Sequence, residues 1–141
     1  MSNSQKLAPE IYRQILNGID LISISVKESK AYINTDLKNP IDIKININTQ
    51  SSFEVKENNI IHITQHYKFD ARKQNSKSRF VQIEVKFLVT LSSKEEFSQD
   101  FFEIYKEVSL RLNTWSYLRE FVNNMTLRMN IPPFTIPLFK A

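Results

Sequence analysis

The chain has 141 residues, of which 41% are hydrophobic and 24% charged, with a formal net charge of +4 and no cysteine. These values are typical of one globular domain, here residues 1–141, and argue against a disordered chain; they exclude disulfides, thiolate metal sites and cysteine nucleophiles. No apolar run approaches the roughly 20 residues of a membrane span, and the polar start lacks the apolar core of a secretion signal, so we expect a cytoplasmic protein.

A short helix and a strand are expected at the start of the chain. Pro9 suits the first turn of a helix, and Gly18 stands where a left-handed residue would end it. From residue 20 to 28, apolar and polar residues alternate with the two-residue period of a strand that buries one face. The inward side chains of this strand are predicted to be Ile22, Ile24 and Val26.

Three further strands are predicted by the same alternation, over residues 41 to 48, 60 to 70 and 80 to 91. Their connections are short and none contains a crossover helix, so the simplest arrangement is an antiparallel meander in chain order. The side chains predicted on the buried face are Ile41, Ile43, Ile45 and Ile47, then Ile61, Ile63, Tyr67 and Phe69, then Val81, Ile83, Val85, Phe87, Val89 and Leu91.

After the last strand the apolar period lengthens to about 3.6 residues, which marks a change from sheet to helix. Ser93 and Glu96 have the spacing of a capping box, which predicts a helix from there to Asn113. A second helix is expected from Thr114 to Asn130. The remaining segment must be extended, because its prolines forbid a helix while its other residues are strongly apolar. These prolines are Pro132, Pro133 and Pro137.

The expected fold class is therefore α+β. A four-stranded antiparallel sheet packs with two C-terminal helices, and a short N-terminal helix and an extended C-terminal tail complete the domain.

The residues contain no catalytic or phosphate-binding motif. A single glycine excludes a glycine-rich phosphate loop. His62 and His66 on one strand would lie about 13 Å apart, at ~3.3 Å per residue, too far to share a zinc ion. No nucleophile, base and orienting residue can be assembled into a set. We therefore expect a protein that is not an enzyme and that uses no metal or cofactor.

Four cations gather at the tip of the hairpin between the last two predicted strands. Arg72, Lys73, Lys77 and Arg79 could contact phosphates without reading a base sequence. However, no aromatic residue lies among them to stack on bases, and a charged hairpin tip also serves solubility. Nucleic-acid binding through this tip is therefore kept as an alternative hypothesis.

Residues 115 to 122 read Trp-Ser-Tyr-Leu-Arg-Glu-Phe-Val, and residues 124 to 138 read Asn-Met-Thr-Leu-Arg-Met-Asn-Ile-Pro-Pro-Phe-Thr-Ile-Pro-Leu. This segment resembles the C-terminal signature of the SecB family, in which a helix with an aromatic-x-Tyr-x-Arg-Glu pattern ends in a proline-rich extended tail. The order of four strands followed by two helices also agrees. The resemblance covers about residues 19 to 139.

The resemblance implies a holding chaperone that captures non-native polypeptides in long apolar grooves, without ATP or metal, as a homotetramer built as a dimer of dimers. Methionine and aromatic side chains adapt to varied apolar shapes, and a strand edge can add main-chain hydrogen bonds to any extended peptide. By resemblance, the client-binding residues come from the second strand, the turn after it, the second helix and the tail. They are Ile43, Ile45, Ile47, Phe53, Trp115, Leu118, Phe121, Val122, Met125 and Phe134.

The chain also departs from the pattern of the export-dedicated members of the family. Those members are acidic and carry a further C-terminal segment that engages the SecA motor, whereas this chain is basic and ends at Ala141. Glu28 and Glu84 match acidic positions for docking that motor, but Tyr32 stands where another acid is expected. Three tasks thus stay open: holding an exported preprotein, protecting the antitoxin of a toxin–antitoxin pair, or general holding of non-native chains. A purely structural subunit, whose apolar tail serves its own oligomer, is a further alternative.

Overall fold

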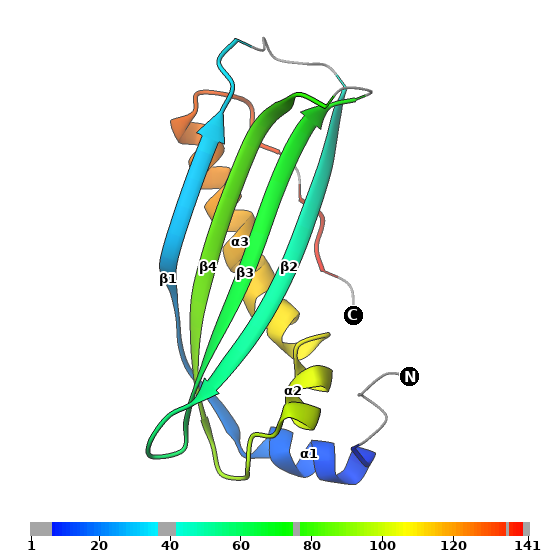
Figure 1. Ribbon diagram of the computed structural model, residues 1–141, viewed down its shortest axis with the longest axis vertical. Coiled ribbons are helices and arrows are strands. Elements are labelled where there is room, and N and C mark those ends of the chain that lie inside the picture. The colour runs from blue at the N-terminus through cyan, green and yellow to red at the C-terminus, as the bar shows by residue number, and fades with distance from the viewer. Residues whose placement is uncertain (1–6, 37–41, 75–76, 135, 140–141) are drawn as a thin grey trace.

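The computed structural model describes residues 7–36, 42–74, 77–134 and 136–139. Four strands form one antiparallel sheet, and a long helix crosses one of its faces (Figure 1). Two short helices lie near one end of the sheet, and the C-terminal tail returns along the long helix (Figure 1). The elements in chain order are α1 (Pro9–Asn17), β1 (Ile19–Ile33), β2 (Ile43–Val55), β3 (Ile60–Lys73), β4 (Arg79–Ser93), α2 (Gln99–Tyr105) and α3 (Ser109–Arg128). The predicted α+β class is confirmed.

The strand order is β1-β4-β3-β2, so the prediction of a simple meander was wrong for β1. Strands β2, β3 and β4 do follow one another as a meander, but β1 pairs with β4. The inward side chains of β4 are at most 2% exposed from Val81 to Leu91, and a strand this apolar is best buried between two neighbours. As a result, β1 and β2 form the two opposite edges of the sheet.

The predicted buried face of β1 was also wrong. None of the 15 residues of β1 is fully buried, and only Ile24 is partly buried away from the strand ends. Its pairing with β4 shifts register between Leu21 and Ser23 and again between Val26 and Glu28, so the regular alternation is interrupted. Ile22 is 54% exposed and Val26 is 49% exposed. The edge position of β1 thus leaves apolar side chains in solvent.

The core lies between the inner face of the sheet and the three helices. The inward side chains predicted for β3 and β4 are buried as expected, and each large one contributes about 1.5–3 kcal/mol to folding. One cluster packs α3 and the tail against the end of the sheet that carries Ala71 and Phe80, and a second packs α1, α2 and the start of α3 against the opposite end. Between the two clusters, the polar side chain of Gln65 is fully buried on the same face.

The helix boundaries differ from the predicted ones. Ser93 belongs to β4, where its N–H bonds the carbonyl of Asn59 at 2.9 Å, so the predicted capping box at Ser93 was wrong. The cap of α2 is Ser98, whose hydroxyl accepts a hydrogen bond from the N–H of Phe101 at 3.1 Å. The chain turns after Tyr105, and α3 begins at Ser109 rather than at the predicted Thr114.

The predicted start of α1 at Pro9 is confirmed, but the left-handed conformation predicted for Gly18 is not. Gly18 has φ −93°, and a Cβ added there would lie 3.1 Å from the Cβ of Lys94. The glycine therefore permits a close approach between the end of α1 and the chain that leaves β4, where Lys94 N–H bonds the Gly18 carbonyl at 3.0 Å.

A left-handed residue occurs instead at the end of α3, where the helix was predicted to stop. Asn130 has φ 58°, and its N–H bonds the carbonyl of Leu127. The next N–H, of Ile131, bonds the carbonyl of Thr126. This pair of bonds is a Schellman motif, which turns the chain sharply out of the helix and allows the tail to return along α3.

Candidate functional site

The edge strand β2 has free main-chain groups along its outer side. Hydrogen bonds join Gln74 N to Asp42 O at 2.9 Å and Lys56 N to Ile60 O at 2.7 Å, with an uninterrupted register between them. Such bonded positions recur every second residue in an antiparallel pair, so the even-numbered residues from 42 to 56 bond to β3. The odd-numbered residues from 43 to 55 therefore turn their N–H and C=O groups toward the free edge.

The same odd-numbered residues direct their side chains to the inner face of the sheet. Ile43, Ile45 and Ile47 are partly buried against the core cluster of α3 and the tail, whereas the even-numbered side chains between them are exposed. Phe53 also lies in β2, so its predicted place in a turn was wrong; its ring centroid lies 5.1 Å from Phe97 and 4.6 Å from Phe102. Four of the predicted client-binding residues thus share one face and one edge.

Trp115 of α3 connects this helix to the tail. Its ring centroid lies 5.9 Å from that of Tyr67 on β3 and 5.7 Å from that of Phe139 in the tail. Its indole N–H donates a hydrogen bond to the carbonyl of Pro137 at 2.7 Å. Because Arg119 Nε also donates to a tail carbonyl, that of Ile136 at 2.9 Å, the tail is held along this flank of the helix.

Phe134 brings the start of the tail onto the inner face of the sheet. Its ring centroid lies 5.3 Å from that of Phe69 and 6.5 Å from that of Phe80. We name the surface that these segments form together the β2 edge surface. It comprises Ile43, Ile45, Ile47, Thr49, Ser51, Phe53, Trp115 and Phe134.

The other predicted client-binding residues lie elsewhere on α3. Leu118 and Val122 are 0% exposed, so they belong to the core that holds α3 on the sheet and present no surface to a client. The ring of Phe121 lies 6.5 Å from that of Phe87, whose partner on β1 is Val26. Met125 follows Phe121 by one helical turn on the same flank. Phe121 and Met125 therefore face the β1 side of the sheet, away from β2.

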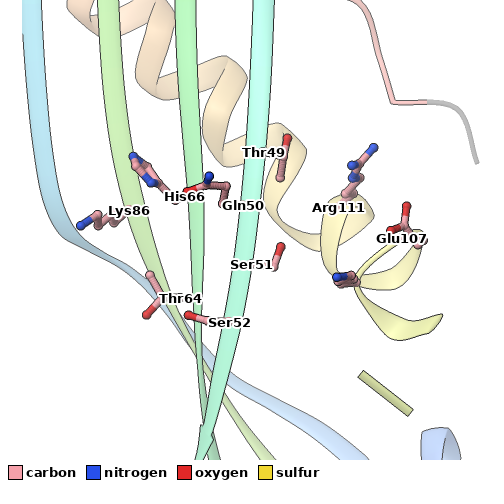
Figure 2. A pocket seen from close by; sticks show the side chains of 10 residues that line it. Thr49, Gln50, Ser51, Ser52, Thr64, His66, Lys86, Glu107 and Arg111 are labelled. Atoms are coloured by element: carbon pink, nitrogen blue, oxygen red, sulfur yellow. The ribbon is translucent and has the colours of Figure 1, made fainter. Parts of the chain in front are cut away.

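A cleft of about 610 Å³ surrounds the edge of β2 near its middle. On the inner side of the strand, Thr49 and Ser51 point toward the junction of α2 and α3, where Glu107 and Arg111 lie (Figure 2). Sequence reasoning missed these residues because the apolar alternation stops before Thr49, although the strand continues. The side chains on the outer side of the strand are Gln50, Ser52, Thr64, His66 and Lys86 (Figure 2).

A chain of hydrogen bonds runs from the inner side of this cleft into the core. Ser51 Oγ donates to Gln65 Oε1, and Gln65 Nε2 donates to the hydroxyl of Tyr67 at 3.2 Å. The Tyr67 hydroxyl lies 2.6 Å from Thr114 Oγ1, which donates to the carbonyl of Leu110 at 2.8 Å. Since that bond uses the one hydroxyl hydrogen of Thr114, Tyr67 is the donor between them. Burial raises the pKa of Tyr67, so it keeps its proton at neutral pH.

We expect Tyr67→Phe to lower the free energy of unfolding by about 1–3 kcal/mol, because it leaves the buried amide of Gln65 and the hydroxyl of Thr114 without their partner. Equilibrium unfolding in urea measures this change. Tyr117→Phe is the matched control, since Tyr117 is 43% exposed, and its effect should stay within about 0.5 kcal/mol. Equal effects of the two variants would contradict a stabilising role for this buried chain of hydrogen bonds.

Glu28 and Glu84, the predicted motor-docking residues, lie together on the outer face of the sheet, each beside a base. Glu28 lies 3.7 Å from Lys86 Nζ, and Glu84 lies 3.0 Å from His66 Nε2 and 3.9 Å from Lys68 Nζ. Lys86 and Lys68 compensate the charge of these two carboxylates, so this face is not an acidic patch.

The arginines of the hairpin tip also have local partners. Arg72 Nε lies 2.7 Å from a carboxylate oxygen of Asp70, and Arg79 donates to the side-chain oxygen of Gln82 at 2.8 Å. These contacts hold the two arginines locally, and nucleic-acid binding at this tip stays a hypothesis.

Within residues 7–36, 42–74, 77–134 and 136–139, no group of three or more His, Cys, Asp or Glu side chains is placed to hold a metal ion. Over the same residues, no helix combines the length and the apolar character that crossing a membrane requires.

A four-stranded antiparallel sheet in the order β1-β4-β3-β2, crossed by a long helix with an extended tail, has the fold of SecB-like chaperones. The predicted SecB-like fold is thereby confirmed. The SecB-like chaperone Rv1957 of Mycobacterium tuberculosis, solved in complex with a ChAD peptide from the HigA1 antitoxin Rv1956, matches with a TM-score of 0.78. The match covers 92% of this chain and 97% of that chain at 12% sequence identity, which is a likeness of fold.

A protein of unknown function from Streptococcus agalactiae also matches, with a TM-score of 0.42, 14% identity and coverage of 85% of this chain and 97% of that chain. No family model and no curated protein matches the sequence.

Proposed function

We propose that this protein is an ATP-independent holding chaperone that binds non-native polypeptides along the β2 edge surface. The observation that carries the proposal is the alternation along β2: its odd-numbered residues have both free main-chain groups and inward side chains. An extended polypeptide added to this edge gains main-chain hydrogen bonds that do not depend on its sequence. Its alternate side chains bury apolar surface beside Ile43, Ile45 and Ile47.

Two exposed apolar side chains follow residues of this surface along the chain: Val55 comes two residues after Phe53, and Leu138 comes after Pro137, whose carbonyl bonds Trp115. Val55, at the end of β2, is 57% exposed, and Leu138, in the tail beside Pro137, is 69% exposed. Exposed apolar side chains beside such a strand edge favour the binding of another polypeptide. The fold shared with a chaperone that was solved with an antitoxin peptide supports the same proposal.

We further propose that the client is a segment of an antitoxin rather than an exported preprotein. The antitoxin peptide of the structural neighbour supports this choice. The paired carboxylates of Glu28 and Glu84 argue in the same direction, because an acidic dock for SecA needs uncompensated charge.

Dilution of a chemically denatured client into buffer tests the proposed function. We expect an equimolar amount of the protein to suppress light scattering by the aggregating client, to the same extent with and without ATP. An equal mass of lysozyme serves as the control for unspecific effects. Scattering that stays unchanged at a severalfold excess of the protein would contradict holding activity.

A further inference from the structure

The β2 edge surface has a polar interruption at its centre. Along the inner face, the odd-numbered residues change from three isoleucines to Thr49 and Ser51 and then back to Phe53. The two hydroxyl residues lie between the two apolar core clusters, because Ile47 packs on one cluster and Phe53 on the other. A polypeptide that follows this edge therefore passes one polar position between two apolar ones.

Arg111 lies beside this interruption as an unpaired cation. It lines the same cleft as Thr49 and Ser51. Its positive charge acts to lower the pKa of Tyr67, the residue opposite Thr49 on β3, against the larger effect of burial. Its side chain is partly buried, and within the described residues its guanidinium has no hydrogen bond or ion pair, not even with Glu107 of the same cleft. An unpaired and partly desolvated guanidinium attracts a carboxylate more strongly than one in open water.

Lys106 lines the cleft too, but its charge is compensated by a neighbouring carboxylate. Its ammonium lies 2.9 Å from a carboxylate oxygen of Glu103 and 5.9 Å from the ring centroid of Phe102. Among the described residues that line the inner side of this cleft, Arg111 is therefore the cation without a partner.

The two hydroxyl groups differ in what they can offer to a ligand. The hydrogen of Ser51 Oγ is donated to Gln65, so Ser51 can only accept. The hydroxyl of Thr49 has no partner among the described residues, and it can donate. The guanidinium of Arg111 adds donors and no acceptor. Thr49 and Arg111 thus both offer unused hydrogens, and Arg111 also carries a positive charge. This position therefore suits an acceptor with negative charge, which in a polypeptide is the carboxylate of Asp or Glu.

The pairing geometry determines which client side chains reach this position. Residues that face each other across a strand pair point to the same face of the sheet, so alternate client residues enter the surface beside the odd-numbered residues of β2. A shift of one residue turns the whole inward set to the other face. A charged residue at one inward position therefore selects one register among the possible ones.

Building on the proposed function, we propose that Arg111 and Thr49 form an acid-selecting step within the polypeptide site. This step favours client segments in which Asp or Glu is flanked, at alternating positions on both sides, by apolar residues. The isoleucines from Ile43 to Ile47 take one apolar flank, and Phe53 takes the other.

A peptide series measured by isothermal titration calorimetry tests the step. The parent peptide has leucine at alternating positions and threonine between them, and its central leucine is replaced by Asp or by Lys. We expect the Asp peptide to bind about tenfold more tightly than the Lys peptide, the scale of one hydrogen bond to a charged group. An isomer with Asp moved by one residue should lose this advantage, because its carboxylate then points to the outer face.

Two variants of the protein complete the design. Arg111→Glu should reverse the preference, so that the Lys peptide binds more tightly than the Asp peptide. Arg128→Glu, the same charge change at the exposed end of α3, should leave the original preference intact. Where Arg111→Glu perturbs the fold, Arg111→Gln should abolish the preference without reversing it.

The outcomes separate this inference from the proposed function. If the parent peptide does not bind at all, the proposed polypeptide site is contradicted. If the parent binds but the Asp, Lys and shifted peptides bind equally, the site stands and the acid-selecting step is overturned. Equal effects of Arg111→Glu and Arg128→Glu would also overturn it, because they would indicate long-range attraction alone.

Discussion

Ile45→Asp should reduce the suppression of client aggregation by about tenfold or more, which corresponds to about 1.4 kcal/mol or more of lost binding energy. Ile45 is the central isoleucine on the inner face of β2, so the carboxylate would lie where the client is expected to bury apolar side chains. Burying an unpaired charge there costs free energy, and the main-chain hydrogen bonds to the client do not compensate this cost. The amount of protein needed for half-maximal suppression measures this loss.

Asn46→Asp provides the matched control, since it introduces a carboxylate one residue away on the exposed outer face of the same strand. This variant should suppress aggregation as well as the unchanged protein. Thermal unfolding of both variants shows whether each keeps the fold. Equal losses in two folded variants would mean that the inner face of β2 is not the binding surface.

We propose that the dimer of dimers implied by the family resemblance assembles through the β1 edge, and we expect Ile22→Lys to dissociate it. The β1 edge exposes Leu21 by 47%, Ile22 by 54% and Val26 by 49%, and an edge strand with exposed apolar side chains favours pairing with another chain. A lysine ammonium buried in a β1–β1 contact would lack a partner, so assembly should weaken by an order of magnitude or more. Native mass spectrometry measures the distribution of masses.

Ser25→Lys, at an exposed position of the same strand, should leave the oligomer unchanged. A monomeric mass for the unchanged protein, or an unchanged oligomer in Ile22→Lys, would contradict assembly through β1. Because β1 and β2 lie at opposite edges, dissociated Ile22→Lys should still bind the parent peptide. Loss of peptide binding together with assembly would instead support an apolar surface that serves only the oligomer.

Local periodicity was sufficient to predict β3, β4 and their inward residues. It ended the second strand at residue 48, whereas β2 continues to Val55, and the predicted inward residue Ile41 lies outside the described residues. It could not place β1, because the alternation of Ile22, Ile24 and Val26 is the same for an edge strand and for a central strand. The pairing of β1 with β4 depends on contacts between distant segments, and the shifts of register beside Leu21 and Val26 leave no mark in the sequence pattern.

The apolar period of the predicted second helix was also insufficient to identify the exposed residues of the candidate site. The 3.6-residue period correctly grouped the apolar residues of α3 but did not distinguish the centre of the stripe from its two flanks. Leu118 and Val122 lie at the centre and are buried, while Trp115 faces the tail and Phe121 faces β4. Thr49 and Ser51 escaped prediction because polar residues on an inward face look, in sequence, like the end of a strand.

The most direct test of the polypeptide site is amide hydrogen exchange of β2, measured by NMR with and without an unfolded client. In the free protein, the even-numbered amides should be protected by their bonds to β3, while the odd-numbered amides from Ile43 to Phe53 should exchange rapidly. On binding of the client, the odd-numbered amides should become protected and the even-numbered ones should change little. Odd-numbered amides that stay unprotected while the client is bound would contradict strand addition at β2.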